Sequence, residues 1–137
     1  MKQYAFAAIL LCAASTVVQA EGLEVTPGLW ETTTTMNNPF AGGEQTNTST
    51  ECVEENYFDP ESMMQDAQGC QLLSNSVEGS TLTFEMVCDA NGAKSNVKGV
   101  FESQGDSGSG RMDMNIDAGG MQMEMNMSWV SKRVGDC

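Results

Sequence analysis

The dipeptide Asn91-Gly92 lies between two segments in which apolar and polar residues alternate. Asn-Gly favours the two-residue type I′ turn that joins antiparallel strands. Such a turn would pair Glu85 with Lys98 and Asp89 with Lys94 on one face, and Met86 with Val97, Leu82 with Phe101 and Phe84 with Gly99 on the other. A slip of one residue would bring charged side chains to the apolar face. The pattern therefore predicts a hairpin in this register.

A second hairpin is predicted around Gly119-Gly120, where residues 111–118 and 121–130 alternate without a break. The turn pairs Ile116 with Met123, and it places polar side chains together on the opposite face. The apolar face carries a stripe of methionines: Met112, Met114, Met121, Met123, Met125 and Met127. We expect residues 105–110, which are rich in Gly and Ser, to form a flexible loop before this hairpin.

Similar reasoning predicts strands over residues 29–36, 45–53 and 71–78. A turn at Gly79-Ser80 would pair Val77 with Leu82 and Leu73 with Met86. Asp59 followed by Pro60 indicates a helix start and predicts one short helix over about residues 60–67. The expected fold is all-β with one short helix. It is an antiparallel up-and-down meander of about seven strands, forming a curved sheet or a small calyx-like barrel.

The first 20 residues have the pattern of a cleaved signal peptide. Lys2 precedes an apolar run, and Ala20 ends a segment with small residues at the cleavage positions. We expect cleavage after Ala20, leaving residues 21–137 as a single β-rich domain in a periplasmic or secreted setting. No later segment approaches the roughly 20 apolar residues of a membrane helix. Stable membrane insertion is therefore not expected.

The expected mature chain contains four cysteines, because Cys12 would leave with the signal peptide. An even number in a small exported domain predicts two disulfides. The pairing Cys52–Cys70 with Cys88–Cys137 is favoured, because the first bond closes a local segment and the second ties down the C-terminus.

Charge and composition exclude several functions. The chain has 19 acidic and 6 basic residues and a net charge of −13, so it would repel phosphate backbones, and nucleic-acid binding is not expected. Histidine, the commonest general base and metal ligand, is absent. We therefore expect no enzymatic activity and no cofactor. A hydrolase that uses only carboxylates is the enzymatic alternative.

The methionine stripe has three interpretations. Methionine fills irregular cores well, and a stripe on a curved sheet could also line a cavity for an apolar ligand. Thioethers also bind Cu(I), which makes the stripe a possible copper face. The structural interpretation is favoured, so no metal ligands are assigned.

Two segments resemble a known family. Pro27-Gly28-Leu29-Trp30-Glu31, the internal cysteines and the ending Arg133-Val134-Gly135-Asp136-Cys137 are similar to small exported bacterial proteins classed as domain of unknown function 3617. The resemblance implies a Gram-negative periplasmic or secreted setting and one β-rich domain. It implies no activity and no site residues.

These observations together predict a non-catalytic binding or envelope accessory module. Its partner would be a small apolar ligand or a protein, whose identity the sequence leaves open. The alternative is a copper-handling protein that uses the methionine-rich hairpin.

Overall fold

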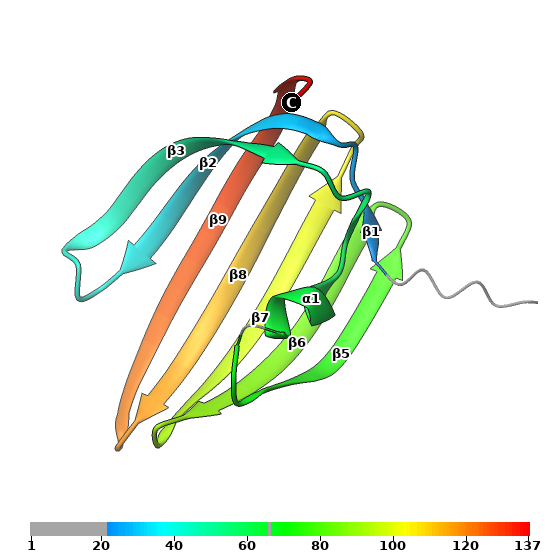
Figure 1. Cartoon of the computed structure of the whole chain (residues 1–137). Helices are drawn as coiled ribbons and strands as arrows, with labels where there is room; N and C mark the ends of the chain where they lie inside the picture. The colour runs from blue at the N-terminus through cyan, green and yellow to red at the C-terminus, as the bar shows by residue number, and fades with distance from the viewer. Residues whose placement is uncertain (1–21, 66) are drawn as a thin grey trace, which may run out of the picture.

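The computed structural model describes residues 22–65 and 67–137, so the predicted signal peptide over residues 1–20 lies outside the described residues (Figure 1). Within these described residues, one short helix accompanies the strands. In chain order the elements are β1 (Leu23–Glu24), β2 (Gly28–Asn38), β3 (Gly43–Val53), β4 (Tyr57–Phe58), α1 (Pro60–Met64), β5 (Cys70–Glu78), β6 (Thr81–Ala90), β7 (Ala93–Ser103), β8 (Ser107–Ala118) and β9 (Met121–Gly135).

Seven of the strands form one antiparallel sheet in the order β3-β2-β9-β8-β7-β6-β5, and β1 pairs separately with β4. Strands β5 to β9 are a meander, and the β2–β3 hairpin joins it through β2 and the last strand. This is the strand order of an up-and-down barrel that is open between β3 and β5. Figure 1 shows the resulting strongly curved sheet, with α1 on its inner side. The expected antiparallel curved sheet is confirmed, and the closed barrel does not form.

Both predicted central hairpins are confirmed in register. Asn91 and Gly92 have φ values of 55° and 81°, as a type I′ turn requires, and Glu85 pairs with Lys98. Gly119 and Gly120 form the second turn. The facing pairs across it are Ile116 with Met123, Met114 with Met125 and Met112 with Met127.

The predicted loop over residues 105–110 is wrong beyond its first two residues, because β8 begins at Ser107. The chain reverses at Gly105, where Gln104 N–H donates to the Ser107 carbonyl at 2.8 Å. Gly110 pairs with Trp129, and a Cβ at Gly110 would overlap the Trp129 ring. The glycine thus provides space for an aromatic ring on the inner face of the sheet, in a regular strand.

Two local predictions differ from the structure at the first edge of the meander. The helix ends at Met64 and is shorter than predicted. An irregularity between Leu72 and Ser74 shifts the β5–β6 register, so Leu72 pairs with Met86 and Leu73 is 52% exposed. A β-bulge adds one residue to a strand and reverses the side-chain alternation beyond it. Val77 pairs with Leu82 as predicted.

The core lies on the inner side of the sheet. Phe84, Met86 and Val97 form a buried cluster, and Met64 of α1 packs against it. Phe101 stacks on Phe58 of β4, with ring centroids 4.5 Å apart, and meets the Trp129 ring edge-on at 4.7 Å. Helix α1 and β4 therefore cover the inner face of β6 and β7. The aromatic rings fill the space between β4 and the sheet there.

The favoured disulfide pairing is wrong, although all four cysteines of the described residues form disulfides: Cys52–Cys137 and Cys70–Cys88. Cys70 and Cys88 face each other across β5 and β6. Cys52 and Gly135 both pair with Leu29, from opposite sides of β2, so the end of the chain crosses the start of β2 to reach Cys52. Each bond therefore ties one edge strand, β3 or β5, to the sheet. The prediction also expected one local closure and one bond at the C-terminus, but it assigned the wrong partner in each.

Candidate functional site

Methionines form much of the inner face of the sheet. The row that contains Met112 and Met127 continues to Met36 on β2, and the row of Met114 and Met125 continues to Val97 and Met86. The inner positions of β9 are half-buried except Met121, which is 66% exposed at the strand start. The face is therefore an apolar surface that the rest of the chain covers only in part.

The predicted stripe divides into two parts with different surroundings. Met112 and Met114 pack against the buried cluster, as the core interpretation requires. Met123 lines a hollow, and Met121 lies exposed at the end of the sheet nearby. Met125 and Met127 are half-buried between these two parts. The stripe thus contributes Met112 and Met114 to the core and Met123 to the lining of the hollow.

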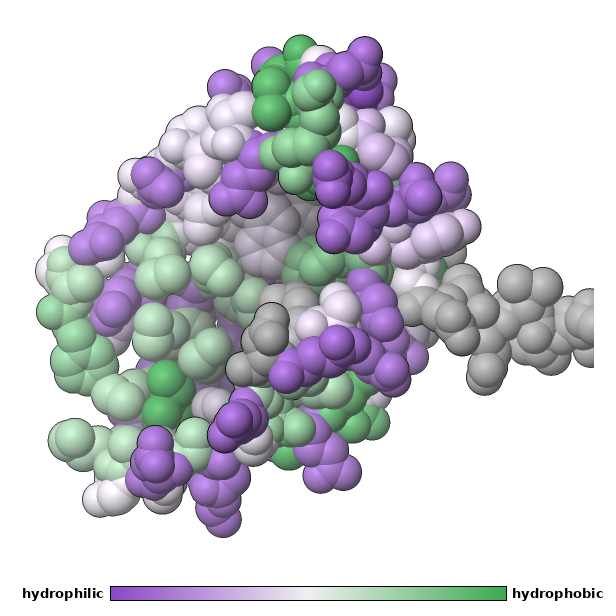
Figure 2. All heavy atoms as spheres, viewed as in Figure 1, coloured by the Kyte–Doolittle hydropathy of each residue, from purple (hydrophilic) through white to green (hydrophobic). Residues whose placement is uncertain are grey.

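The hollow has a volume of about 1210 Å³ and lies at the end of the sheet where the β2–β3, β6–β7 and β8–β9 turns gather. Strands β6 to β9 contribute one inner row to it: Cys88, Ser95, Ile116 and Met123. Phe40, at the tip of the β2–β3 hairpin, lies across from this row and is 71% exposed. In Figure 2 the hollow opens on the left of the molecule, with hydrophobic residues along its lower side.

Between Trp30 and Met36, the inner positions of β2 and of the facing part of β3 carry hydroxyl and amide side chains, which no sequence pattern assigned to the site. Thr33 pairs with Thr48 at 3.0 Å and Thr35 with Thr46 at 3.3 Å between their hydroxyl oxygens on the outer face. Side chains alternate along a strand, so Thr34 and its partner Asn47 lie on the inner face beside Trp129. Strand β3 has almost no apolar residues, so its sequence does not indicate which side chains face the inside of the sheet. The register of β3 on β2 shows this instead.

The outer face of β8 carries an ion pair between Arg111 and Asp113. Arg111 Nε donates to Asp113 at 3.1 Å, and Asn126 Nδ2 donates to the same carboxylate at 3.2 Å. The hydrogen bond from Arg111 is the main cause that lowers the pKa of Asp113 below its ordinary value. Partial burial raises the pKa by a smaller amount, and the hydrogen bond from Asn126 lowers it further. Within residues 22–65 and 67–137, no group of three or more His, Cys, Asp or Glu side chains is arranged to hold a metal ion.

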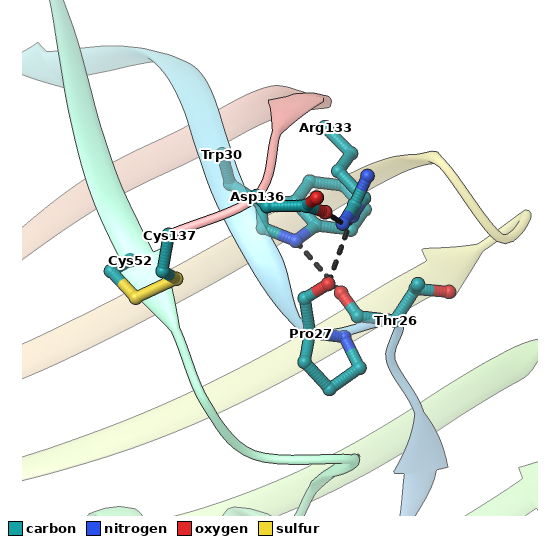
Figure 3. Close-up of a disulfide and its surroundings, with 7 residues drawn as sticks. All are labelled: Thr26, Pro27, Trp30, Cys52, Arg133, Asp136 and Cys137. Atoms are coloured by element: carbon teal, nitrogen blue, oxygen red, sulfur yellow. Dashed lines mark hydrogen bonds and ion pairs between the residues drawn. A yellow bond between two sulfur atoms is a disulfide. The ribbon is translucent and has the colours of Figure 1, made fainter.

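The two segments that resemble a family meet where β2 begins and β9 ends (Figure 3). The hollow lies at the other end of these strands, near the start of β9. Trp30 Nε1 donates to the Thr26 carbonyl at 2.9 Å, and Arg133 Nε donates to the Pro27 carbonyl at 2.9 Å. Arg133 also forms an ion pair with Asp136, next to the Cys52–Cys137 disulfide. We name this group, Thr26, Pro27, Trp30, Cys52, Arg133, Asp136 and Cys137, the terminal clasp.

A family model described as "Protein of unknown function (DUF3617)" matches residues 25–137, which include the whole clasp and the whole seven-stranded sheet. The chain belongs to this family. No curated protein and no solved structure matches it. In this DUF3617 protein the Pro-Gly-Leu-Trp-Glu and Arg-Val-Gly-Asp-Cys segments build the clasp, so the resemblance lies in a structural feature remote from the hollow.

Two features bear on where the protein functions. Its two disulfides suggest a compartment outside the reducing cytoplasm. In the part of the chain that the structure describes, no helix has the length and apolar character needed to cross a bilayer.

Proposed function

We propose that this DUF3617 protein is an exported, non-catalytic module that binds a small apolar ligand in the hollow of its curved sheet. The observation that carries the proposal is the continuity of the half-buried methionine surface with a hollow of about 1210 Å³. Small-molecule sites are concave and mostly apolar and commonly have volumes of roughly 300–1,000 Å³, so the hollow is large enough to hold one such ligand. The periplasm or the extracellular space fits both the disulfides and the N-terminal sequence.

The chemistry of the lining supports a ligand of variable shape. Methionine is unbranched and polarizable, so a methionine surface adapts to different apolar partners. Ile116 and Met123 form the apolar side of the hollow, and the exposed ring of Phe40 lies across from them. Covering these groups removes apolar surface from water, which contributes about 25 cal/mol per Å².

A charge placed in the hollow is expected to weaken binding. Met123→Glu should reduce the affinity for an environment-sensitive apolar fluorophore at least about tenfold, because the ligand would have to desolvate a carboxylate. Val130→Glu is the matched control, since Val130 lies on the same strand, faces outward and is 62% exposed. Fluorescence titration of both variants measures the difference. Equal affinities for the two variants, or no fluorophore binding by the native protein, would contradict the proposal.

A copper-handling role is the second candidate, and the register favours it in one respect. Met36, Met127 and Met112 lie side by side in one row across β2, β9 and β8, with the Met125–Met114 row adjacent. Three neighbouring thioethers are a suitable ligand set for Cu(I).

A paired leucine variant distinguishes the two candidates. Met112→Leu with Met127→Leu keeps the volume and apolar character of the row but removes two sulfur ligands. If the hollow binds apolar ligands, the affinity for the fluorophore should change less than about twofold, a difference within 0.5 kcal/mol. Copper analysis of protein equilibrated with Cu(I) is the second measurement. Stoichiometric Cu(I) in the native protein that the leucine variant loses would favour the copper role.

A further inference from the structure

The inner face of the sheet has two walls of different chemistry. Strands β6 to β9 provide the apolar wall described above. Strands β2 and β3 provide a wall of hydroxyl and amide groups, which we name the polar wall: Thr32, Thr34, Gln45, Asn47 and Ser49. In Figure 2 hydrophilic and neutral residues gather at the upper left of the molecule, over β2 and β3, above the hydrophobic residues at its lower left.

The polar wall contains no charged side chain. The next inner row towards the terminal clasp holds Glu51 and Arg133, one on each side of Trp30. Arg133 is engaged there by the Pro27 carbonyl and by Asp136. Along the described strands of the sheet, charged residues at inner positions are thus confined to the clasp end. The hollow is also lined by Asp89, Lys94, Asp117 and Glu124, which occupy outward-facing positions of β6 to β9.

Part of the polar wall is available to a ligand. Thr32 is engaged, because its hydroxyl lies 2.8 Å from that of Ser131. Within residues 22–65 and 67–137, no side-chain hydrogen bond involves Thr34 or Asn47. The row that contains them continues across β9 to Trp129. An amide, a hydroxyl and an aromatic ring therefore lie in one row on the inner face.

We propose that the ligand is an uncharged amphiphile whose hydroxyl- or amide-bearing head lies against the polar wall and whose hydrocarbon tail lies along the methionines. This inference rests on the proposed binding of apolar ligands. Hydroxyl and amide groups both donate and accept hydrogen bonds, so they match an uncharged polar head. They do not neutralise a charge, and burying an unpaired charge is costly. The net charge of −13 adds repulsion against an anionic head.

Three ligands with the same dodecyl chain test the preference for the head group. Dodecyl glucoside is uncharged, dodecanoate is anionic and dodecyltrimethylammonium is cationic. Each is titrated by calorimetry into the full protein below its micelle-forming concentration. Dodecyl glucoside is expected to bind at least about tenfold more tightly than either charged ligand. Tighter binding of dodecanoate or of the cationic ligand would overturn the inference.

Variants of the polar wall locate the preference. Thr34→Val with Asn47→Leu should bring the affinity for dodecyl glucoside to within about twofold of that for dodecanoate. Thr48→Val, on the outer face of β3, is the matched control and should keep the tenfold preference. Equal binding of all three ligands by the native protein would overturn the head-group inference and leave apolar binding standing. Failure of all three to bind would overturn both proposals.

Discussion

Replacing Cys52 and Cys137 by serine is expected to lower the free energy of unfolding by about 4–5 kcal/mol. This disulfide closes a loop with a sequence separation of 85 residues, so its loss greatly increases the conformational freedom of the unfolded chain. Urea denaturation followed by tryptophan fluorescence measures the change, because Trp30 lies in the terminal clasp and is 6% exposed.

The second disulfide provides the control for this prediction. Cys70–Cys88 closes a separation of only 18 residues, and its removal by paired serine substitutions should cost about 3 kcal/mol. A larger loss for the Cys70–Cys88 variant than for the Cys52–Cys137 variant would contradict the loop-entropy argument. It would indicate that the local packing of β5 dominates.

The terminal clasp also has a structural consequence for the proposed site. It joins the start of β2 to the end of β9 and fastens β3 through Cys52. The polar wall is therefore fixed to the apolar wall at one end of the sheet, while the hollow lies at the other end. The family-like segments support the site from a distance and do not contribute side chains to it.

Local signals explain why the two central hairpins could be predicted from the sequence. Asn91-Gly92 determines the turn, and the alternation on both sides leaves one register in which Phe84 faces Gly99 and charges oppose charges. The methionine pairs across Gly119-Gly120 follow in the same way. Both hairpins join neighbouring segments, so turn chemistry and side-chain period were sufficient.

The wrong predictions involve long-range or subtle constraints. The disulfide pairing depends on β2 lying beside β9, which no local pattern in the sequence indicates. The register of Leu72 depends on a bulge in β5. Gly108 and Gly110 suggested flexibility, whereas the space above Gly110 is filled by Trp129 from another strand. Each of these features becomes visible only when distant segments are placed together.

One part of the candidate site, the methionine face, could be predicted from the sequence, and the other part, the polar wall, could not. The alternation in residues 111–130 placed the methionines on one face, and the structure places that face inside the curve of the sheet. The polar wall was missed because residues 43–50 contain no large apolar side chain to mark an inner face. Only the pairing of Asn47 with Thr34 shows which residues of β3 face inward.

Phe84→Ala is expected to lower the free energy of unfolding by about 3–5 kcal/mol. The Phe84 side chain is 1% exposed and lies at the centre of the buried cluster with Met86 and Val97. Its ring lies directly over Gly99, and an added Cβ at Gly99 would overlap the ring. The absence of a side chain at Gly99 therefore provides the space that the Phe84 ring occupies. Urea denaturation measures the loss, and a loss below about 1 kcal/mol would show that the site collapses onto the cavity.

Gly99→Ala tests whether the glycine serves this ring. In the native background the substitution should cost about 1–3 kcal/mol, because the new methyl group overpacks the Phe84 ring. In the Phe84→Ala background the same change should cost nothing or stabilise, because the methyl group enters the vacated space and alanine restricts the unfolded chain. Gly135→Ala is the control, since no atom lies within 4 Å of its added Cβ. Equal costs of Gly99→Ala in the two backgrounds would show that the glycine is required for the backbone and not for the ring.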